Sequence, residues 1–311
     1  MSKLGRTLVI VNPQSRNGRA LVGAERIEEV SDWARAAGYV DCLDVRKTEK
    51  PGHATYLAQC ATGYHTVLVC GGDGVIHETV NGLMQIPEAL RPTLGVIPFG
   101  NGNDTARSLG MSLDVSLALE QLFQGQVKPI DIGECNGRFF IETLSFGLDA
   151  AIAMGTHQRR MRTGREGTVL FVEEGVNQIL FHRDSYGCTY TLDDEEPRRG
   201  SFILMAVQNG PTYGGGFKVT PGADMSDGMF DLCFFEGPCS LPKASVLFLM
   251  AKEGKHVGLS SKFRFHTASR IHLSFDQEPP AQIDGEAFAG REFDVELHHH
   301  ALSVLCGPVL P

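Results

Sequence analysis

Short apolar runs alternate with stretches of helical periodicity over the first 125 residues of the chain. The runs at residues 67–70 and 94–98 carry no charged or hydroxyl side chain, which is typical of strands buried on both faces of a parallel sheet. This alternating order of strands and helices predicts a Rossmann-like α/β domain with a parallel sheet. The predicted strands are residues 7–11, 39–45, 66–70 and 94–98. Three predicted helices end near Ala37, Thr62 and Leu83, and two more span residues 103–109 and 112–124.

The pattern changes near Lys128, where short segments of alternating polar and apolar residues begin. Such segments, separated by glycine and proline turns, are typical of an antiparallel sandwich or barrel. Two predicted helices, at 167–182 and 241–252, interrupt them. We therefore predict an α/β nucleotide-binding domain over residues 1–128 and a β-sandwich over residues 129–300. The alternating segments are 130–135, 138–144, 186–192, 201–208, 229–235, 263–266, 270–275, 281–284, 292–297 and 301–306.

Two glycine-rich breaks follow the apolar runs of the first domain, at residues 71–74 and 98–104. Glycine lets the backbone approach an anion closely, and a helix that follows presents free N–H groups. Two such turns at the ends of neighbouring strands predict a phosphate site. Within it, Asp73 would contact a magnesium ion or accept a fixed hydrogen bond. The alternatives are a tight structural turn for the first break and an ordinary helix cap for the second.

Pairs of carboxylates occur at two places in the second domain. Asp284 and Glu286 flank a glycine, so a bent strand would direct both into one cleft, where one would serve as general base. A β-hairpin turn, which Asp-Gly favours, explains the same residues. Asp224 and Asp227 lie three apart in a loop, a spacing that suits a hard cation completed by carbonyl groups and equally a solvated turn.

Residues 157–165 contain four arginines and no acidic residue. Most charge runs are solvated loops. The sharper hypothesis is attraction to a nucleotide or to an anionic membrane leaflet, where each basic residue contributes roughly 1 kcal/mol. The four residues are Arg159, Arg160, Arg162 and Arg165.

Composition narrows the class of protein. Of the 311 residues, 42% are hydrophobic and 21% are charged, as in an ordinary folded protein. The eight cysteines are scattered without a CxxC pair, which favours a reducing compartment, the cytoplasm, over a disulfide scaffold or a cysteine-based zinc site. With no signal-peptide pattern and no apolar span near 18 residues, we expect neither secretion nor membrane crossing. The formal net charge of −9 argues against a general nucleic-acid binder.

The motifs taken together resemble the diacylglycerol kinase catalytic-domain family, in particular the bacterial soluble lipid kinases, with sphingosine and ceramide kinases as relatives. They occur in family order along nearly the whole chain. The matching segments are Asn12-Pro13 with Ser15 and Gly18, Thr48 with Gly52-His53-Ala54, and residues 71–83, 98–110, 223–228 and 284–286.

The resemblance implies an ATP- and magnesium-dependent lipid kinase, with ATP held between the two domains and residues 301–311 returning to the first. Glu286 would take the proton from a lipid hydroxyl, with Asp284 beside it. A structural magnesium ion would be held by Asp224, Asp227 and the carbonyl group of Met229. The residues implied to hold the nucleotide are Asn12, Thr48, Gly71, Gly72, Asp73, Gly74, Val75, Glu78, Asn101, Gly102 and Asn103.

The same resemblance implies a membrane lipid as substrate and reversible contact with the membrane surface, through the four arginines and nearby apolar residues. Relatives of this type are often homodimers. Val75 and Asn101 stand where the family usually has threonine, and His77 replaces a usual asparagine. Because backbone N–H groups do much of the holding in such turns, we expect nucleotide binding to survive these changes.

Two rival functions remain. One is an NAD kinase, which shares a GGDG turn and a β-sandwich partner domain; the loop around Asn101 and the segment at 284–286 argue against it. The other is a catalytically inactive nucleotide- or lipid-binding sensor, against which the retained Asp284 and Glu286 argue.

Overall fold

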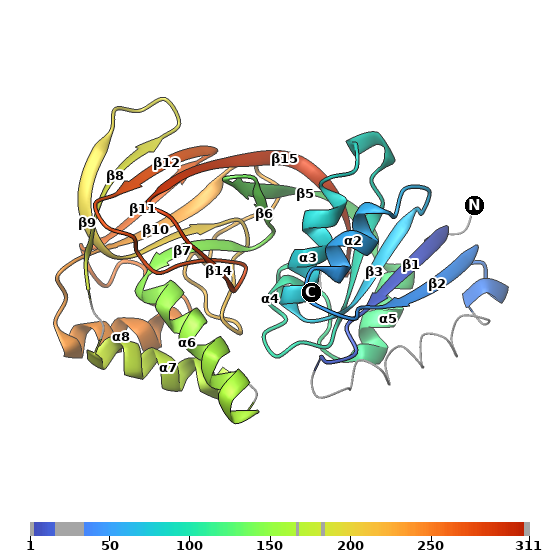
Figure 1. Ribbon diagram of the computed structural model, residues 1–311, viewed down its shortest axis with the longest axis horizontal. Coiled ribbons are helices and arrows are strands. Elements are labelled where there is room, and N and C mark those ends of the chain that lie inside the picture. The colour runs from blue at the N-terminus through green and yellow to red at the C-terminus, as the bar shows by residue number, and fades with distance from the viewer. Residues whose placement is uncertain (1–2, 16–33, 166–167, 182–183, 308–311) are drawn as a thin grey trace. The chain divides into compact units, whose positions relative to one another are not determined.

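The computed structural model describes residues 3–15, 34–165, 168–181 and 184–307 (Figure 1). The chain divides into two compact units, residues 1–130 with 300–311 (unit 1) and residues 131–299 (unit 2). Most of the helix predicted to end near Ala37, together with Gly18, lies outside the described residues.

Unit 1 is built on a parallel sheet in the order β2-β1-β3-β4, with the end of β15 added in parallel beside β4. Every side chain of β3 is buried, which explains its continuously apolar sequence. The strands are β1 (Arg6–Val11), β2 (Cys42–Lys47), β3 (Thr66–Gly71) and β4 (Thr93–Pro98). The helices are α2 (His53–Gln59), α3 (Asp73–Leu83), the 3-10 helix η1 (Glu88–Leu90), α4 (Asp104–Ser108) and α5 (Val115–Gln124).

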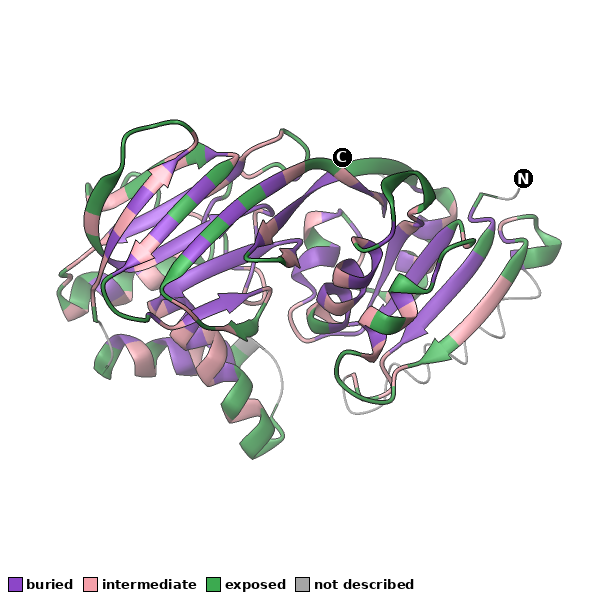
Figure 2. Ribbon diagram, turned by 45° about the horizontal axis from the view of Figure 1, so that its top comes forward, coloured by how far each residue is buried: buried purple, intermediate pink, exposed green. Residues whose placement is uncertain are grey.

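Unit 2 consists of antiparallel strands in the order β14-β13-β7-β9-β8-β12-β15, and β10 pairs with both β9 and β11. Buried and exposed residues alternate along β12 and the first part of β15 (Figure 2), because one face packs on the core of the unit. The remaining strands are β5 (Gln126–Cys135), β6 (Arg138–Phe140), β7 (Thr143–Gly147), β8 (Tyr186–Leu192), β9 (Arg198–Gln208), β10 (Phe230–Glu236), β11 (Phe263–Ala268), β12 (Arg270–Phe275), β13 (Ala281–Ile283), β14 (Glu286–Phe288) and β15 (Glu292–Cys306). The helices are α6 (Leu148–Thr163), α7 (Thr168–Phe181) and α8 (Leu241–Ala251).

One strand, β15, belongs to both units. It pairs antiparallel with β12 in unit 2, and its Val304 pairs in parallel with Leu94 of β4 in unit 1. Its burial pattern changes accordingly, from alternation near Phe293 to continuous burial at residues 304–306. The predicted separate strands 292–297 and 301–306 are therefore parts of one continuous strand.

The structure corrects two further predictions. Residues 148–163 form the helix α6, which the sequence did not predict, because Gly155 and the polar run from residue 157 onwards interrupt its apolar periodicity. Gly155 is needed where α6 meets α7, since a Cβ there would lie 2.5 Å from Glu174 Oε1. The predicted strand 138–144 is broken into β6 and β7. No helix in the described part of the chain is both long enough and apolar enough to cross a membrane.

Candidate active site

The two glycine-rich turns of unit 1 lie against each other. Strands β3 and β4 are neighbours, with Gly71 opposite Pro98, and the Phe99 N–H donates to the Gly71 carbonyl at 2.8 Å. A Cβ on Gly72 would lie 2.7 Å from the Gly100 Cα, so neither glycine tolerates a side chain while the turns touch. The structure thus brings together the two breaks from which the phosphate site was predicted.

Other predicted nucleotide residues stand at the same edge of the sheet. Asn12 directly follows β1 and Thr48 directly follows β2, and these strands run parallel to β3 and β4. The Thr48 N–H donates to the Val11 carbonyl at 2.8 Å, and the Asn12 side chain accepts from the Gln14 N–H at 3.0 Å. Four strand ends therefore meet at one carboxyl edge, the usual ligand-binding edge of an open parallel sheet.

Polar side chains fasten the second turn to the first. Asp73, in the first turn of α3, accepts a hydrogen bond from the Thr105 N–H at 3.2 Å. Asn103 is buried with φ at 53°, and its Oδ1 accepts from the Gly100 N–H at 2.6 Å. Asn103 thus holds its own turn closed, while Asn101 and Gly102 are half-buried on the outside of that turn.

Val75 and Glu78 have structural contacts that the sequence did not reveal. Val75 is buried, and a Cβ on Gly71 would lie 2.2 Å from Val75 Cγ1, so Val75 packs beneath the turn. The Glu78 carboxylate accepts from the N–H groups of Gly52 and Ala54 at 2.9 and 3.1 Å, at the start of α2. Gly74, directly before Val75, is exposed. These contacts fix the loop after Thr48 against α3.

In unit 2, Asp284 and Glu286 lie in and beside a two-residue hairpin turn between β13 and β14. Asp284 and Gly285 both have positive φ, 48° and 87°, as a tight hairpin turn requires. The Asp284 carboxylate accepts three N–H groups, from Ile141, Glu142 and Thr143, at 2.9 to 3.0 Å. These bonds explain the break between β6 and β7, and they tie the turn to that segment.

Glu286 is the first residue of β14, and its side chain is exposed. Among the described residues it has no hydrogen-bond or ion-pair partner. The two carboxylates of this segment therefore differ: that of Asp284 accepts three backbone N–H groups, and that of Glu286 has no such partner among the described residues.

The acidic loop predicted to hold magnesium is internally ordered. Asp224 accepts from the Ser226 N–H and Oγ at 3.0 and 2.7 Å, and Asp227 accepts from the Met229 N–H at 3.0 Å. Burial raises the pKa of Asp231 on β10, and the charges of Asp227 and Asp224 raise it further. Asp224 and Asp227 thus lie close enough to disfavour the charged form of Asp231.

A fully buried carboxylate, which sequence reasoning missed, anchors this loop. Asp131 accepts from the Gly228 N–H at 2.8 Å, and its own N–H donates to the Met225 carbonyl at 2.6 Å. Its other oxygen lies 2.8 Å from His299 Nδ1. The local sequence gave no signal for this role, because Asp131 looks like one polar position in an alternating strand.

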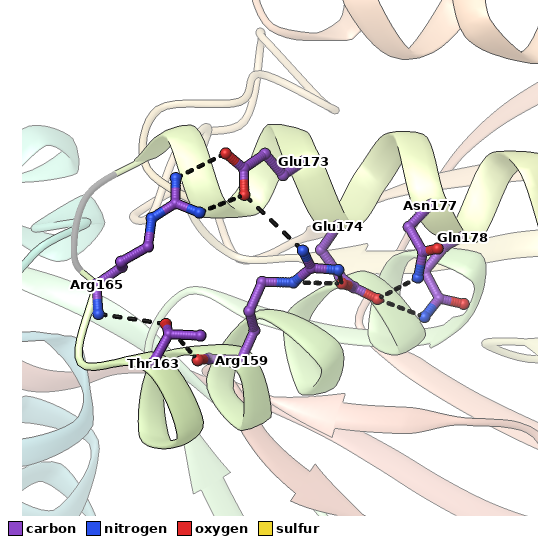
Figure 3. A network of polar contacts seen from close by, with 7 residues as sticks. All are labelled: Arg159, Thr163, Arg165, Glu173, Glu174, Asn177 and Gln178. Carbon is purple, nitrogen blue, oxygen red and sulfur yellow. Dashed lines mark hydrogen bonds and ion pairs between the residues drawn. The ribbon is translucent and has the colours of Figure 1, made fainter.

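The arginine run covers the end of α6 and the two residues after it, and acidic residues of α7 partly neutralise it (Figure 3). Arg159 contacts Glu174 at 2.7 Å, and Arg165 contacts Glu173 at 2.7 Å. Glu174 is buried and also accepts from the side chains of Asn177 and Gln178. Two of the four predicted membrane-contact arginines are therefore ion-paired, while Arg160 is half-buried and Arg162 exposed.

A second buried acid missed by sequence reasoning is Asp149, at the start of α6. Burial raises the pKa of Asp149 to about 6, because its effect outweighs that of the hydrogen bonds from Ser145 and Tyr213, which lower the pKa. The Tyr213 hydroxyl donates to Asp149 Oδ1. Because the folded pKa lies above the model-peptide value of 3.8, folding favours the protonated acid.

We expect this acid to make unit 2 less stable as the pH rises. Its contribution is fully present below pH 4 and is lost as the pH rises through about 6, a change of roughly 3 kcal/mol for two pKa units. Urea unfolding at pH 4 to 7 measures it. Asp149→Asn, which keeps an acceptor for Tyr213, should flatten the profile; an unchanged profile in this variant would contradict the assignment.

Comparison with known proteins matches residues 6–135 to the diacylglycerol kinase catalytic domain, and residues 142–306 to the YegS C-terminal NAD kinase beta sandwich-like domain. The chain belongs to the diacylglycerol kinase catalytic-domain family. It is 30% identical over 284 residues to the diacylglycerol kinase of Bacillus subtilis, covering 90% of this chain and 89% of that protein. It is 26% identical to "Probable lipid kinase YegS-like" of Cronobacter sakazakii, covering 100% and 99% of the two chains.

Solved structures show the same fold. A diacylglycerol kinase from Bacillus anthracis aligns over 100% of both chains with a TM-score of 0.78 and 21% identity. An NAD kinase from Archaeoglobus fulgidus, solved with ATP, aligns over 97% of this chain and 93% of that one, with a TM-score of 0.51 and 12% identity. The predicted fold class, parallel α/β followed by an antiparallel β-sandwich, is confirmed, and the family resemblance is confirmed with it.

Proposed function

We propose that this family member is an ATP- and magnesium-dependent lipid kinase that transfers the γ-phosphoryl group of ATP to a lipid hydroxyl. The observation that carries the proposal is the contact between Gly72 and Gly100 at the carboxyl edge of the parallel sheet. Because Gly72 and Gly100 carry no side chain where the turns meet, backbone N–H groups of these turns can approach phosphate oxygens. Phosphoryl transfer depends mainly on positioning and on charge stabilisation, which such a surface supplies.

In this proposal, Glu286 accepts the proton of the lipid hydroxyl as that oxygen attacks phosphorus. Its exposed, unpaired carboxylate suits a general base. Asp284 acts as a positioning residue, because its three backbone hydrogen bonds leave it no free role as a base and hold the hairpin that carries Glu286.

A magnesium ion fits the acidic loop. Asp224 and Asp227 offer carboxylate oxygens, Met229 offers a carbonyl group, and mutual repulsion with Asp231 indicates uncompensated negative charge. When bound there, the ion would neutralise this charge and hold the loop that Asp131 anchors. A second magnesium ion, bound with ATP, would neutralise charge on the phosphoryl oxygens.

The test is transfer of labelled phosphate from ATP to diacylglycerol, sphingosine and ceramide in mixed micelles, and to NAD in solution, with and without magnesium. The name of the Bacillus subtilis relative makes diacylglycerol the first lipid to try. We expect magnesium-dependent transfer to one lipid class and none to NAD. Transfer to NAD alone, or nucleotide binding without any transfer, would overturn the proposal in favour of a rival function.

A further inference from the structure

Exposed apolar side chains of unit 2 gather on α7, on α8 and in the turn after α8. Of the sixteen large hydrophobic side chains exposed in the described part of the chain, nine lie in these three segments, so they are concentrated rather than scattered. We call this set the α7–α8 apolar face. It consists of Val169, Val176, Leu180, Phe181, Val246, Leu249, Met250, Val257 and Leu259.

Each helix buries one side and exposes apolar residues on the other. On α7, Val169, Val176 and Leu180 follow one another at intervals of seven and four, which places them on one stripe. Leu170 and Ile179 of α7 are buried. Leu249 is 62% exposed and Phe181 is 72% exposed. In an ordinary surface helix, large apolar side chains face the core and are far less exposed.

The two helices pack side by side (Figure 1). A Cβ on Gly175 of α7 would lie 2.2 Å from the Phe248 ring of α8. The inner sides are anchored in the core, where the ring centroids of Phe248 and Phe217 are 5.2 Å apart. Val176, which follows Gly175, and Leu249, which follows Phe248, are exposed, and no element among the described residues covers them.

The border of this face is basic, although the whole chain has a formal net charge of −9. Residues 236–264 contain five lysines and arginines against two acids. Lys243 and Lys252 are exposed, and so is Arg162 at the end of α6. Lys255 is ion-paired with Glu253, and Arg264 with Glu236. Arg159 and Arg165 are ion-paired with Glu174 and Glu173, so the basic charge outside ion pairs comes mainly from Lys243 and Lys252, in and directly after α8.

We propose that the α7–α8 apolar face and its lysines form a docking surface for an anionic lipid bilayer. This inference rests on the proposed function, which requires a membrane lipid as substrate. Apolar side chains would enter the interfacial region while the lysines contact anionic headgroups. A second copy of the chain fits less well, because two-fold pairing of this face would bring its lysines against one another.

The experiment is flotation with vesicles of phosphatidylglycerol and phosphatidylcholine, performed without ATP. The test variant combines Val246→Gln, Leu249→Gln and Met250→Gln, all at exposed positions. The control variant combines Leu113→Gln and Leu117→Gln, which are exposed apolar residues of unit 1. Thermal unfolding confirms that both variants are folded.

We expect wild type and control to float with anionic vesicles, and the test variant to bind at least about tenfold more weakly. Vesicles of phosphatidylcholine alone, or high salt, should weaken binding of the wild type. Unchanged flotation of the test variant would overturn the proposal. The proposal would also be overturned if light scattering showed that the wild type is a dimer and the test variant a monomer, because a second copy would then cover the face.

Activity separates this proposal from the function on which it rests. Transfer to a short-chain diacylglycerol dissolved as monomers should be equal in wild type and test variant, while transfer to vesicle-embedded lipid should fall about as far as binding does. Absence of all transfer, with flotation still lost in the test variant, would overturn the kinase assignment and leave the docking surface standing.

Discussion

Glu286→Gln lowers phosphoryl transfer to lipid by about 10²- to 10⁴-fold, the range expected when a general base is removed. Gln keeps the size of the side chain and cannot accept the hydroxyl proton. Because Glu286 is exposed and has no partner among the described residues, the change should leave the free energy of unfolding within about 0.5 kcal/mol of wild type. Binding of ATP should also persist, since the turns that would hold it belong to unit 1.

The measurement is a transfer assay with the lipid that gives the highest wild-type rate, together with ATP binding by calorimetry. Glu278→Gln is the matched control, because Glu278 is an exposed glutamate of the same unit. If the Glu286→Gln variant transferred phosphate at the wild-type rate, Glu286 would be excluded as the general base. Loss of activity in both glutamate variants would indicate a general effect of charge.

Gly100→Ala strongly weakens nucleotide binding and destabilises unit 1. The new Cβ would lie 2.4 Å from the Gly72 Cα and 2.7 Å from Asn103 Oδ1. The first neighbour is backbone and cannot rotate away, so the two turns must separate. Overpacking of this kind costs about 1–3 kcal/mol of stability, and it displaces the N–H groups of both turns from their common target.

Calorimetric titration with ATP and urea unfolding measure the two effects. Gly222→Ala serves as the control, because its Cβ would meet no atom within 4 Å. We expect ATP affinity in Gly100→Ala to fall by at least about a hundredfold, since a mispositioned phosphate loses several charge-assisted hydrogen bonds. Wild-type affinity in that variant would mean that the nucleotide is bound elsewhere.

The part of the fold that follows from local chemistry was predictable. The apolar runs ending at Cys70 and Pro98 must be buried on both faces, and this requirement alone indicates parallel strands. The glycine clusters after them predicted two turns that meet, because the carboxyl ends of neighbouring parallel strands share an edge. The helix α8 was predicted at 241–252 and spans Leu241–Ala251, and the described part of α7 falls within the predicted range 167–182.

What escaped prediction depends on contacts between residues far apart in sequence. Glu78 was assigned to the nucleotide, yet its carboxylate meets the N–H groups of Gly52 and Ala54, more than twenty positions earlier. Asp284 bonds three N–H groups about 140 positions earlier. The charge of Arg159 is offset by Glu174 on the next helix. A sequence shows which groups carry charge, and only tertiary packing decides which of them remain available for chemistry.

The shared strand β15 dictates an order of events during protein synthesis. Unit 1 needs Val304 beside Leu94, yet about 170 residues separate its first segment, which ends at residue 130, from the segment that begins at residue 300. At about 5–20 residues per second, the ribosome takes roughly ten to thirty seconds to make that stretch. Throughout this interval the outer edge of the apolar strand β4 remains unpaired, an open template for another chain. The nascent N-terminal unit is therefore the stage at which this protein most needs chaperones.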